Sequence, residues 1–311
     1  MKALITGGSG FLGRHLVKEL LRLNYDTIVY DLDNPPEYRA LVKGTSHLKY
    51  VKGDILDFEA LEKAMKGCDV VFHTAAIADL DKTRLVPRQT MHVNVVGTAN
   101  CLEAAKNAGV KRFLFASSVY TAGKWGSFYR VSKQAGESLC KTFYEEYGLS
   151  YTILRYGSLY GRDSNHWNFI YGVCKALLTK GEFTYISSKD SVREYIHIFD
   201  AARETVRISA DPEFANKAVL VTGHQRMKIE EFFTMLTEII GKDVKIHYTP
   251  AKQHKHYVIT PYSFEVDVPI RVNLTSYVDI SEGILDCLRE VQKELDNEKN
   301  KNNPVKNEGE P

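Results

Sequence analysis

The chain has 311 residues, of which 44% are hydrophobic and 26% charged, and its net charge is +2. This composition is typical of a globular protein with one large domain or two unequal ones, and so small a net charge argues against a nucleic-acid or membrane partner. No apolar run approaches the roughly 20 residues of a membrane-spanning helix, and because the sequence opens directly on a core strand we expect no signal peptide.

The first predicted elements are a buried strand over residues 2–6, a glycine-rich turn, and a helix whose apolar periodicity runs over 16–23. In this order they are typical of a dinucleotide-binding turn. Gly7 lets the chain turn off the strand, Gly10 lets a pyrophosphate approach the backbone, and Gly13 lets the helix pack closely. The free N–H groups near Phe11 and Leu12 favour the negative charge of the pyrophosphate. The alternative is an ordinary glycine-rich turn.

A second strand over residues 26–30 ends at Asp31. A carboxylate at this place accepts hydrogen bonds from the hydroxyls of the adenosine ribose and repels a 2′-phosphate. No arginine follows directly to attract that phosphate. The sequence therefore predicts NAD rather than NADP, although an aspartate that only forms the turn after a strand is the alternative.

Strands and helices go on alternating through the first half of the chain, which favours an α/β fold with a Rossmann-type, doubly wound parallel sheet. We predict further strands over residues 48–54, 68–75, 111–117 and 150–155, and helices over 57–66, 88–108 and 129–147. Residues 1–160 are accordingly predicted to form an NAD-binding domain.

The pattern becomes shorter and more mixed after residue 160. Residues 161–296 are predicted to be mainly a smaller α/β substrate cap, with segments that return to the main sheet. Its predicted helices lie near 168–178, from 200, and over 227–240 and 280–295, and its strands near 183–186, 195–198, 217–222 and 244–248. Residues 297–311 have no apolar periodicity, and we expect a disordered tail.

Three side chains of the first half form a pattern typical of proton transfer. Tyr129 and Lys133 open a predicted helix and share one face of it. An isolated phenol titrates near about pH 10, and a neighbouring ammonium is expected to lower that value. Ser117 and Ser118 follow a strand, at the sheet edge where ligands of such folds bind. A serine there can polarise the substrate oxygen beside the tyrosine. The alternative is that Tyr129 and Lys133 only belong to a solvated helix face.

The sequence resembles the extended short-chain dehydrogenases/reductases, which include the NAD-dependent sugar-nucleotide epimerases and dehydratases. The segment at 192–198 looks especially like the UDP-glucose 4-epimerases. The resemblance covers nearly all of residues 1–290 and is carried by TGGSGFLG at 6–13, GDI at 53–55, HTAA at 73–76, NVVGT at 94–98, SS at 117–118, Tyr129-x-x-x-Lys133, LRYGSLYG at 154–161 and VREYIHI at 192–198.

The resemblance implies a set of cofactor contacts. Asp54 and Ile55 would contact the adenine, Ala75 and Ala76 would line the diphosphate and ribose, and Asn94 would buttress the site. Tyr156 would lie beside the nicotinamide, and Lys133 would also hold the nicotinamide ribose.

It also implies catalytic and substrate contacts. Ser118 aligns with the family's catalytic Ser/Thr, Tyr129 would be the base and Lys133 its partner. Ser158 stands where the epimerases have an Asn that touches the sugar diphosphate. Asn168 would donate to the nucleotide, or alternatively cap a helix. Arg193 would clamp the diphosphate, or alternatively form a surface ion pair with Glu194 or Asp200.

Departures from the family pattern decide the reaction that we predict. The dehydratases place an Asp-Glu pair after the catalytic Ser/Thr, the decarboxylases a Glu, and certain epimerase–reductases a Cys beside it, whereas Val119 and Tyr120 follow Ser118 here. Ser, Tyr, Lys and NAD suffice to remove a hydride and return it to the other face. We therefore predict 4-epimerisation of a nucleotide-diphosphate sugar, with a UDP-sugar favoured. A dehydrogenase or 4-keto reductase is the alternative, and a non-catalytic NAD sensor a third. The segment between Ser118 and Tyr129 is also shorter than in the family.

The remaining expectations concern metal, location and assembly. The cysteines are odd in number, lie far apart and include no Cys-x-x-Cys pair, so we expect reduced thiols in a cytoplasmic protein and neither disulfides nor a metal site. In the resembled family the helices at 88–108 and 129–147 form a dimer interface, which implies a homodimer. The cysteines are Cys68, Cys101, Cys140, Cys174 and Cys287.

Overall fold

The computed structural model describes residues 1–33, 35–36, 44–164, 166–224, 226–241, 243–249, 270–274 and 276–302. The main sheet contains the strands Lys2–Thr6 (β1), Asp26–Asp31 (β2), Leu48–Lys52 (β3), Val70–His73 (β4), Arg112–Ser118 (β5), Tyr151–Tyr156 (β6), Lys217–Val221 (β10) and Ile270–Arg271 (β13). Their order across the sheet is β3-β2-β1-β4-β5-β6-β10-β13, and every neighbouring pair is parallel. The predicted Rossmann-type α/β fold is confirmed.

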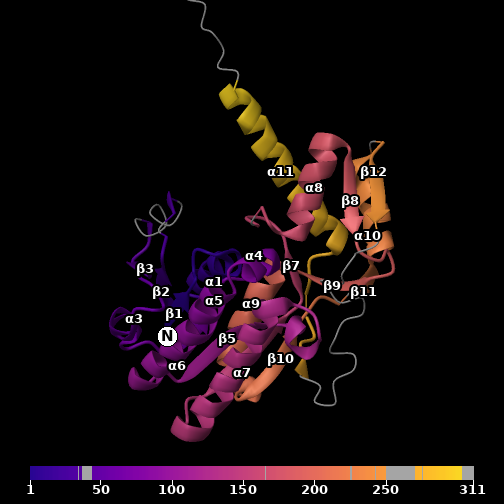
Figure 1. Ribbon diagram of the computed structural model, residues 1–311. Coiled ribbons are helices and arrows are strands. Elements are labelled where there is room, and N and C mark those ends of the chain that lie inside the picture. The colour runs from indigo at the N-terminus through magenta and orange to yellow at the C-terminus, as the bar shows by residue number, and fades with distance from the viewer. Residues whose placement is uncertain are drawn as a thin grey trace, which may run out of the picture.

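Helices cover both faces of this sheet (Figure 1). One face packs against Phe11–Arg22 (α1) and Ile198–Ala210 (α9), which contact each other. The other face packs against Phe58–Met65 (α3), Gly97–Asn107 (α6) and Ser127–Tyr147 (α7). Apolar side chains alternate between the two cores because successive residues of a strand point to opposite faces.

The predicted helix over 88–108 differs from the structure in one respect. The chain forms Pro87–Met91 (α5), a π-helical turn over His92–Val96, and then α6, without leaving the helical path. A π-turn inserts one extra residue into the helix and often lies at a functional site. Asn94 lies within it and is buried. The preceding short helix, Leu80–Leu85 (α4), lies against α7.

Most of the described second half lies beside the main sheet (Figure 1), where it forms two smaller sheets and a group of helices. Ser158–Tyr160 (β7), Val192–His197 (β9) and Arg226–Lys228 (β11) form one sheet, and Glu182–Ile186 (β8) pairs with Lys245–Thr249 (β12) in the other. The helices are Phe169–Lys180 (α8), Ile229–Ile240 (α10) and Ile280–Asn302 (α11). As predicted, a late strand, β10, returns to the main sheet. The division of the chain at residue 160 stays a prediction.

The last helix corrects the expected start of the tail. α11 continues beyond residue 295 to Asn302, whereas we expected disorder from residue 297. Charged side chains dominate the end of this helix. The apolar periodicity therefore stops several residues before the helix itself ends. Residues 303–311 lie outside the described residues.

Candidate active site

The glycine turn joins β1 to α1 with the tight geometry that the sequence predicts. Gly7 has a φ of 71°, which favours glycine. A Cβ on Gly13 would lie 2.2 Å from the Gly7 carbonyl oxygen, so only glycine lets α1 start this close to the strand. Gly10 is the N-cap of α1 and, among the described residues, no side chain caps this helix. Phe11 and Leu12 follow it in the first turn, whose N–H groups suit an anion.

Asp31 ends β2 beside this turn. Its Oδ2 accepts a hydrogen bond of 2.8 Å from the Ser9 backbone N–H, and its Oδ1 accepts one of 3.4 Å from that of Asp33. The structure therefore brings the carboxylate and the glycine turn together, although the turn-forming contact to Asp33 is also present. The ribose contact stays a prediction.

Two further pairs of predicted cofactor residues follow the neighbouring strands. Asp54 accepts the Leu56 backbone N–H at 2.9 Å, and Ile55 is buried against α6 at Gly97. Ala75 lies against the glycine turn, because a Cβ on Gly7 would be 2.6 Å from its nitrogen. Ala76 follows it and is partly exposed.

Asn94 connects the π-turn to two other segments. Its Oδ1 accepts the Ile77 N–H at 2.8 Å, and its Nδ2 lies 3.0 Å from both the Ile77 carbonyl and the Ser132 Oγ. Ser132 precedes Lys133 on α7. Asn94 thus fixes the start of α7 to the loop after β4, and its support of the cofactor site stays a prediction.

The three predicted catalytic side chains meet at the carboxyl end of β5. Ser118 ends that strand and is buried, while Tyr129 and Lys133 lie one turn apart in α7. The Ser118 side chain is close enough to the Tyr129 phenol to favour a lower pKa of that phenol. The Lys133 Nζ donates to the Ala116 carbonyl at 2.7 Å and lies 5.8 Å from the centroid of the Tyr129 ring.

The expected acidity of Tyr129 is not found in this structure. Burial raises the pKa of Tyr129 to about 12, and the nearby Ser118 side chain opposes that rise without overcoming it. Burial also lowers the pKa of Lys133 to about 8, with Cys140 and Glu137 acting in the opposite direction. A nearby ammonium was expected to dominate, but burial of the phenol is the largest cause of the shift in its pKa.

Tyr156 does not join the catalytic group. Its ring is buried in the core on the α1 and α9 face, and its hydroxyl is 2.5 Å from the Thr205 Oγ1 of α9. Lys133 lies on the opposite, α7 face. The expected contact between Tyr156 and the nicotinamide is therefore not supported, because side chains alternate along β6 and this one points to the other side.

The predicted substrate residues are spread over the second half. Ser158 begins β7 and is partly exposed. Asn168 caps α8, with its Oδ1 accepting the Ile170 and Tyr171 N–H groups at 3.1 and 3.4 Å, while its Nδ2 donates to the Leu159 carbonyl at 2.8 Å. The capping alternative for Asn168 is thus present, and its contact with a nucleotide stays a prediction.

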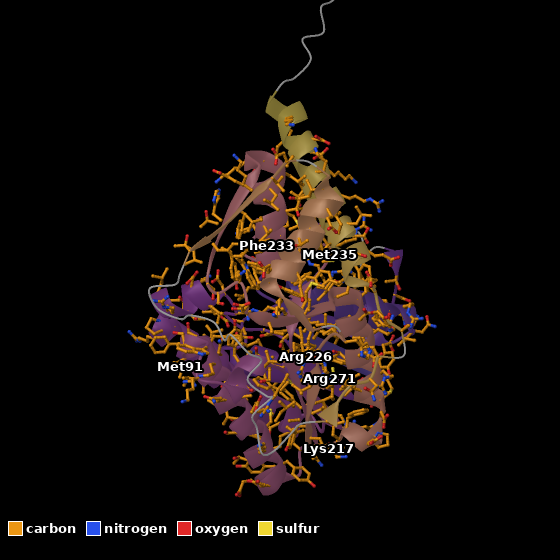
Figure 2. All side chains as sticks on the ribbon, turned by 90° about the vertical axis from the view of Figure 1, so that its right-hand side faces the viewer. Met91, Lys217, Arg226, Phe233, Met235 and Arg271 are labelled. Carbon is orange, nitrogen blue, oxygen red and sulfur yellow. The ribbon has the colours of Figure 1, made fainter. Side chains whose placement is uncertain are left out.

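Arg193 lies in β9 and is buried, and its guanidinium donates to the Val192 carbonyl at 3.0 Å. The neighbouring carboxylate of Glu194 forms ion pairs with Arg226 of β11, at 2.7 Å, and with Arg271 of β13, at 3.0 Å. Figure 2 labels these two arginines near each other. These contacts join the second sheet to the edge of the main one.

Sequence reasoning missed two buried polar residues beside the site. His73 links Thr6 and Thr98, with N–O distances of 2.7 and 2.9 Å. The carboxylate of Glu137, one turn after Lys133, accepts hydrogen bonds from the side chains of Ser117 and Arg155. His73 lies within the HTAA segment, and the four-residue spacing from Lys133 could have indicated Glu137.

Comparison with known proteins gives the family. A model of the NAD dependent epimerase/dehydratase family matches residues 3–223. The chain belongs to this family. Its cofactor is therefore NAD, as predicted. An uncharacterized UDP-glucose epimerase of Bacillus subtilis is 26% identical over 271 residues, which cover 80% of this chain and 85% of that protein.

Two solved structures share the fold of this family member. The UDP-glucose 4-epimerase of Thermotoga maritima, with UDP-glucose, has a TM-score of 0.77 at 23% identity and covers 95% of this chain and 100% of its own. The dTDP-glucose 4,6-dehydratase of Streptomyces venezuelae has a TM-score of 0.82 at 24% identity, covering 94% and 97%. The fold alone therefore does not separate epimerase from dehydratase.

Within the described ranges, no group of three or more His, Cys, Asp or Glu side chains could hold a metal ion. No helix in the same part of the chain is long and apolar enough to cross a membrane.

Proposed function

We propose that this family member is a 4-epimerase of a nucleotide-diphosphate sugar, with a UDP-sugar favoured. The observation that carries the proposal is the meeting of Ser118, Tyr129 and Lys133 at the end of β5, with Val119 and Tyr120 where a dehydratase needs its acids. The nearby carboxylate of Glu137 binds Arg155 through both oxygens, at 3.0 and 2.8 Å. That pairing makes it a poor acid for eliminating water.

The glycine turn fits the cofactor of the family. A Cβ on Gly10 would meet only the Gly7 carbonyl oxygen, at 3.1 Å, so the turn leaves room for a group at its outer side. The uncapped first turn of α1 would hold a diphosphate, Asp31 would hold the adenosine ribose, and Lys133 the nicotinamide ribose. When bound, NAD supplies the acceptor and donor of the hydride, and a positive charge in its oxidised form.

The chain's own residues move the proton. Tyr129 takes the proton of the sugar's C4 hydroxyl when the hydride leaves C4, and returns it when the hydride comes back to the other face of the ketone. Ser118 donates to the substrate oxygen and holds it beside the phenol. A pKa of about 12 means that Tyr129 is protonated at neutral pH, so positive charge near the phenol is required before it can accept a proton.

Substrate contacts are proposed for three side chains outside the catalytic group. Arg193 would clamp the diphosphate with charge-assisted hydrogen bonds. Asn168 and Ser158 would contact the nucleotide and sugar diphosphate. Relatives in this family with UDP-sugars in their names support the choice of nucleotide.

The main experiment measures epimerisation without added cofactor. Purified protein is incubated with UDP-glucose, UDP-glucuronate or their C4 epimers, and the products are separated by chromatography. We expect interconversion of one pair with no accumulation of NADH. Stoichiometric NADH would instead indicate the dehydrogenase alternative and overturn epimerisation. Absence of turnover with bound NAD, on a broad panel of nucleotide sugars, would favour the sensor.

A variant of the base tests the mechanism. Tyr129→Phe should retain NAD binding, measured by fluorescence titration, and lose nearly all turnover because the phenyl ring cannot accept a proton. Tyr147→Phe is a matched control, since Tyr147 lies at the other end of α7 and is 60% exposed. Turnover of Tyr129→Phe equal to that of Tyr147→Phe would contradict the mechanism.

A homodimer through α6 and α7 is also proposed. Exposed apolar side chains on these helices and the adjoining π-turn include Val96, Phe128, Val131 and Tyr144, and apolar patches of this kind mark association surfaces. Sedimentation velocity should give twice the chain mass, and Val131→Glu should give the monomer. A wild-type monomer at micromolar concentration would contradict the proposal. The cytoplasmic location stays a prediction.

A further inference from the structure

We propose that Glu137 is a positioning residue of this site: its buried carboxylate fixes the backbone that carries Ser118 and lies one helical turn from Lys133. The proposal rests on the proposed function for its kinetic consequences only. Glu137 lies on α7 one turn beyond Lys133, and two turns beyond Tyr129, so the three residues share one face of the helix.

The carboxylate binds both residues that flank Ser118 in space. The Ser117 Oγ donates to the Glu137 Oε1 at 2.5 Å. The Thr121 Oγ1 lies 3.1 Å from the same oxygen and 2.8 Å from the Ser118 carbonyl oxygen, and its single hydrogen can serve either acceptor. The end of β5 and the short helical turn after it are thus fixed to α7 on either side of the catalytic serine.

Arg155 of β6 holds the carboxylate in one orientation. Its Nε donates to Oε1 at 3.0 Å and its Nη2 to Oε2 at 2.8 Å, and the two side chains are only 12% and 7% exposed. Two parallel charge-assisted bonds fix the plane of a carboxylate. Glu137 therefore joins α7, β5 and β6 at the point where the reaction takes place.

A buried ion pair of this kind is weak evidence for stability, because desolvation of the two charges offsets most of their attraction. The hydrogen-bond partners of Glu137 point to a role in positioning rather than in stability. Ser117 and Thr121 have no other acidic partner among the described contacts, and both are part of the segment that sets the position of Ser118. Small displacements of such a group reduce turnover strongly, by about a hundredfold for 1 Å.

The electrostatic part of the proposal concerns Lys133, whose side chain is buried. The titratable and charged groups around it are Tyr129, Glu137 and Cys140 on α7, His73 on β4, and Arg155 on β6 through Glu137. Burial lowers the pKa of Lys133, while Cys140 and Glu137 raise it. Because Cys140 is buried and its pKa is raised, it stays neutral near pH 7. The Glu137 carboxylate, which pairs with Arg155, is then the group on α7 that favours the charged lysine.

The test compares Glu137→Gln with a matched control on the other face of the sheet. Glu204 of α9 is also a buried carboxylate, paired with Arg207 at 2.7 Å, so Glu204→Gln removes an equivalent charge away from the site. For both variants we would measure kcat and KM for the nucleotide sugar from pH 6 to 9, NAD affinity, and thermal unfolding. The Lys133 pKa would be read from the pH titration of ¹³Cε-lysine NMR signals, assigned with Lys133→Met.

For Glu137→Gln we expect a fall in kcat of about ten- to a hundredfold, with KM and NAD affinity nearly unchanged. The Lys133 titration and the alkaline limb of kcat should both move to lower pH. Glu204→Gln should lose a similar amount of thermal stability. It should show neither the fall in kcat nor the move of the Lys133 titration to lower pH. If Glu137→Gln does not fold, Ser117→Ala removes one hydrogen bond alone, and it should lower kcat without moving the Lys133 titration.

Two outcomes would overturn the proposal: an unchanged Lys133 titration in Glu137→Gln, or a kcat equal to that of Glu204→Gln. The NMR readout does not depend on the reaction. A wild-type protein that epimerises no nucleotide sugar would contradict the proposed function, while a shifted Lys133 titration would still support the position of Glu137.

Discussion

His73 is buried among hydroxyl groups, and its neutrality should make the fold sensitive to acid. The Thr98 Oγ1 donates to the Asn94 carbonyl at 2.6 Å, so it accepts from the His73 Nε2 at 2.9 Å. The Nδ1 then accepts from the Thr6 hydroxyl at 2.7 Å. Both ring nitrogens are satisfied only in the neutral form with hydrogen on Nε2. Burial, with a smaller effect of Lys133, lowers the pKa of His73 from 6.5 to about 3.

The sign and size of the effect follow from linkage. Between pH 6.5 and about 3 the unfolded chain binds a proton on His73 that the folded chain excludes, so stability falls as the pH falls through this window. At 1.36 kcal/mol per pKa unit, the loss is about 3 kcal/mol by pH 4.5 and approaches roughly 5 kcal/mol below pH 3. Above pH 6.5 the residue contributes no pH dependence.

The assay is urea unfolding at pH steps from 7.5 to 4.5, with the wild type beside His73→Gln, whose amide keeps a donor and an acceptor but does not titrate. His15, with its pKa lowered to about 4 by burial, acts in the same direction and remains in the variant. We expect the variant to be less stable at pH 7.5 and to lose about 3 kcal/mol less on acidification to pH 4.5. Parallel pH dependences for the two proteins would refute the reasoning.

The remaining predictions concern single side chains. Gly13→Ala should abolish NAD binding in a titration, because its Cβ would lie 2.2 Å from the Gly7 carbonyl oxygen; binding like the wild type would contradict the turn geometry. Gly172→Ala, inside α8 with no atom within 4 Å of the added Cβ, should raise the free energy of unfolding by about 1 kcal/mol. Asn168→Ala should lower it by about 1 kcal/mol through loss of the α8 cap, and unchanged thermal unfolding would show that the cap contributes nothing.

Local patterns predicted the parts of the site that depend on neighbouring residues in the chain. The glycine turn, Asp31 and the one-turn spacing of Tyr129 and Lys133 are properties of short segments, and the structure places them as expected. Ser118 also follows this rule, since a residue that ends a parallel strand lies at the ligand edge of the sheet.

Tertiary surroundings account for what the sequence did not predict. The face to which Tyr156 points depends on the register of β6 between α7 and α9. The raised pKa of Tyr129 depends on how many atoms surround its hydroxyl. The π-turn around Asn94 depends on contacts with Ile77 and Ser132, which lie far away in the sequence. None of these quantities is a property of a local pattern.

The place of β10 has a consequence for how the polypeptide is made. β6 is complete at Tyr156, but its partner on the outer side, β10, begins only at Lys217, after most of the second half. During synthesis β6 is therefore an edge with unpaired backbone groups and apolar side chains until the ribosome has passed β10. A chain cut at residue 160 keeps that edge permanently, and such edges promote association between molecules. Shortened versions that keep residues through β13, which pairs with the outer side of β10, should be the ones that stay monodisperse.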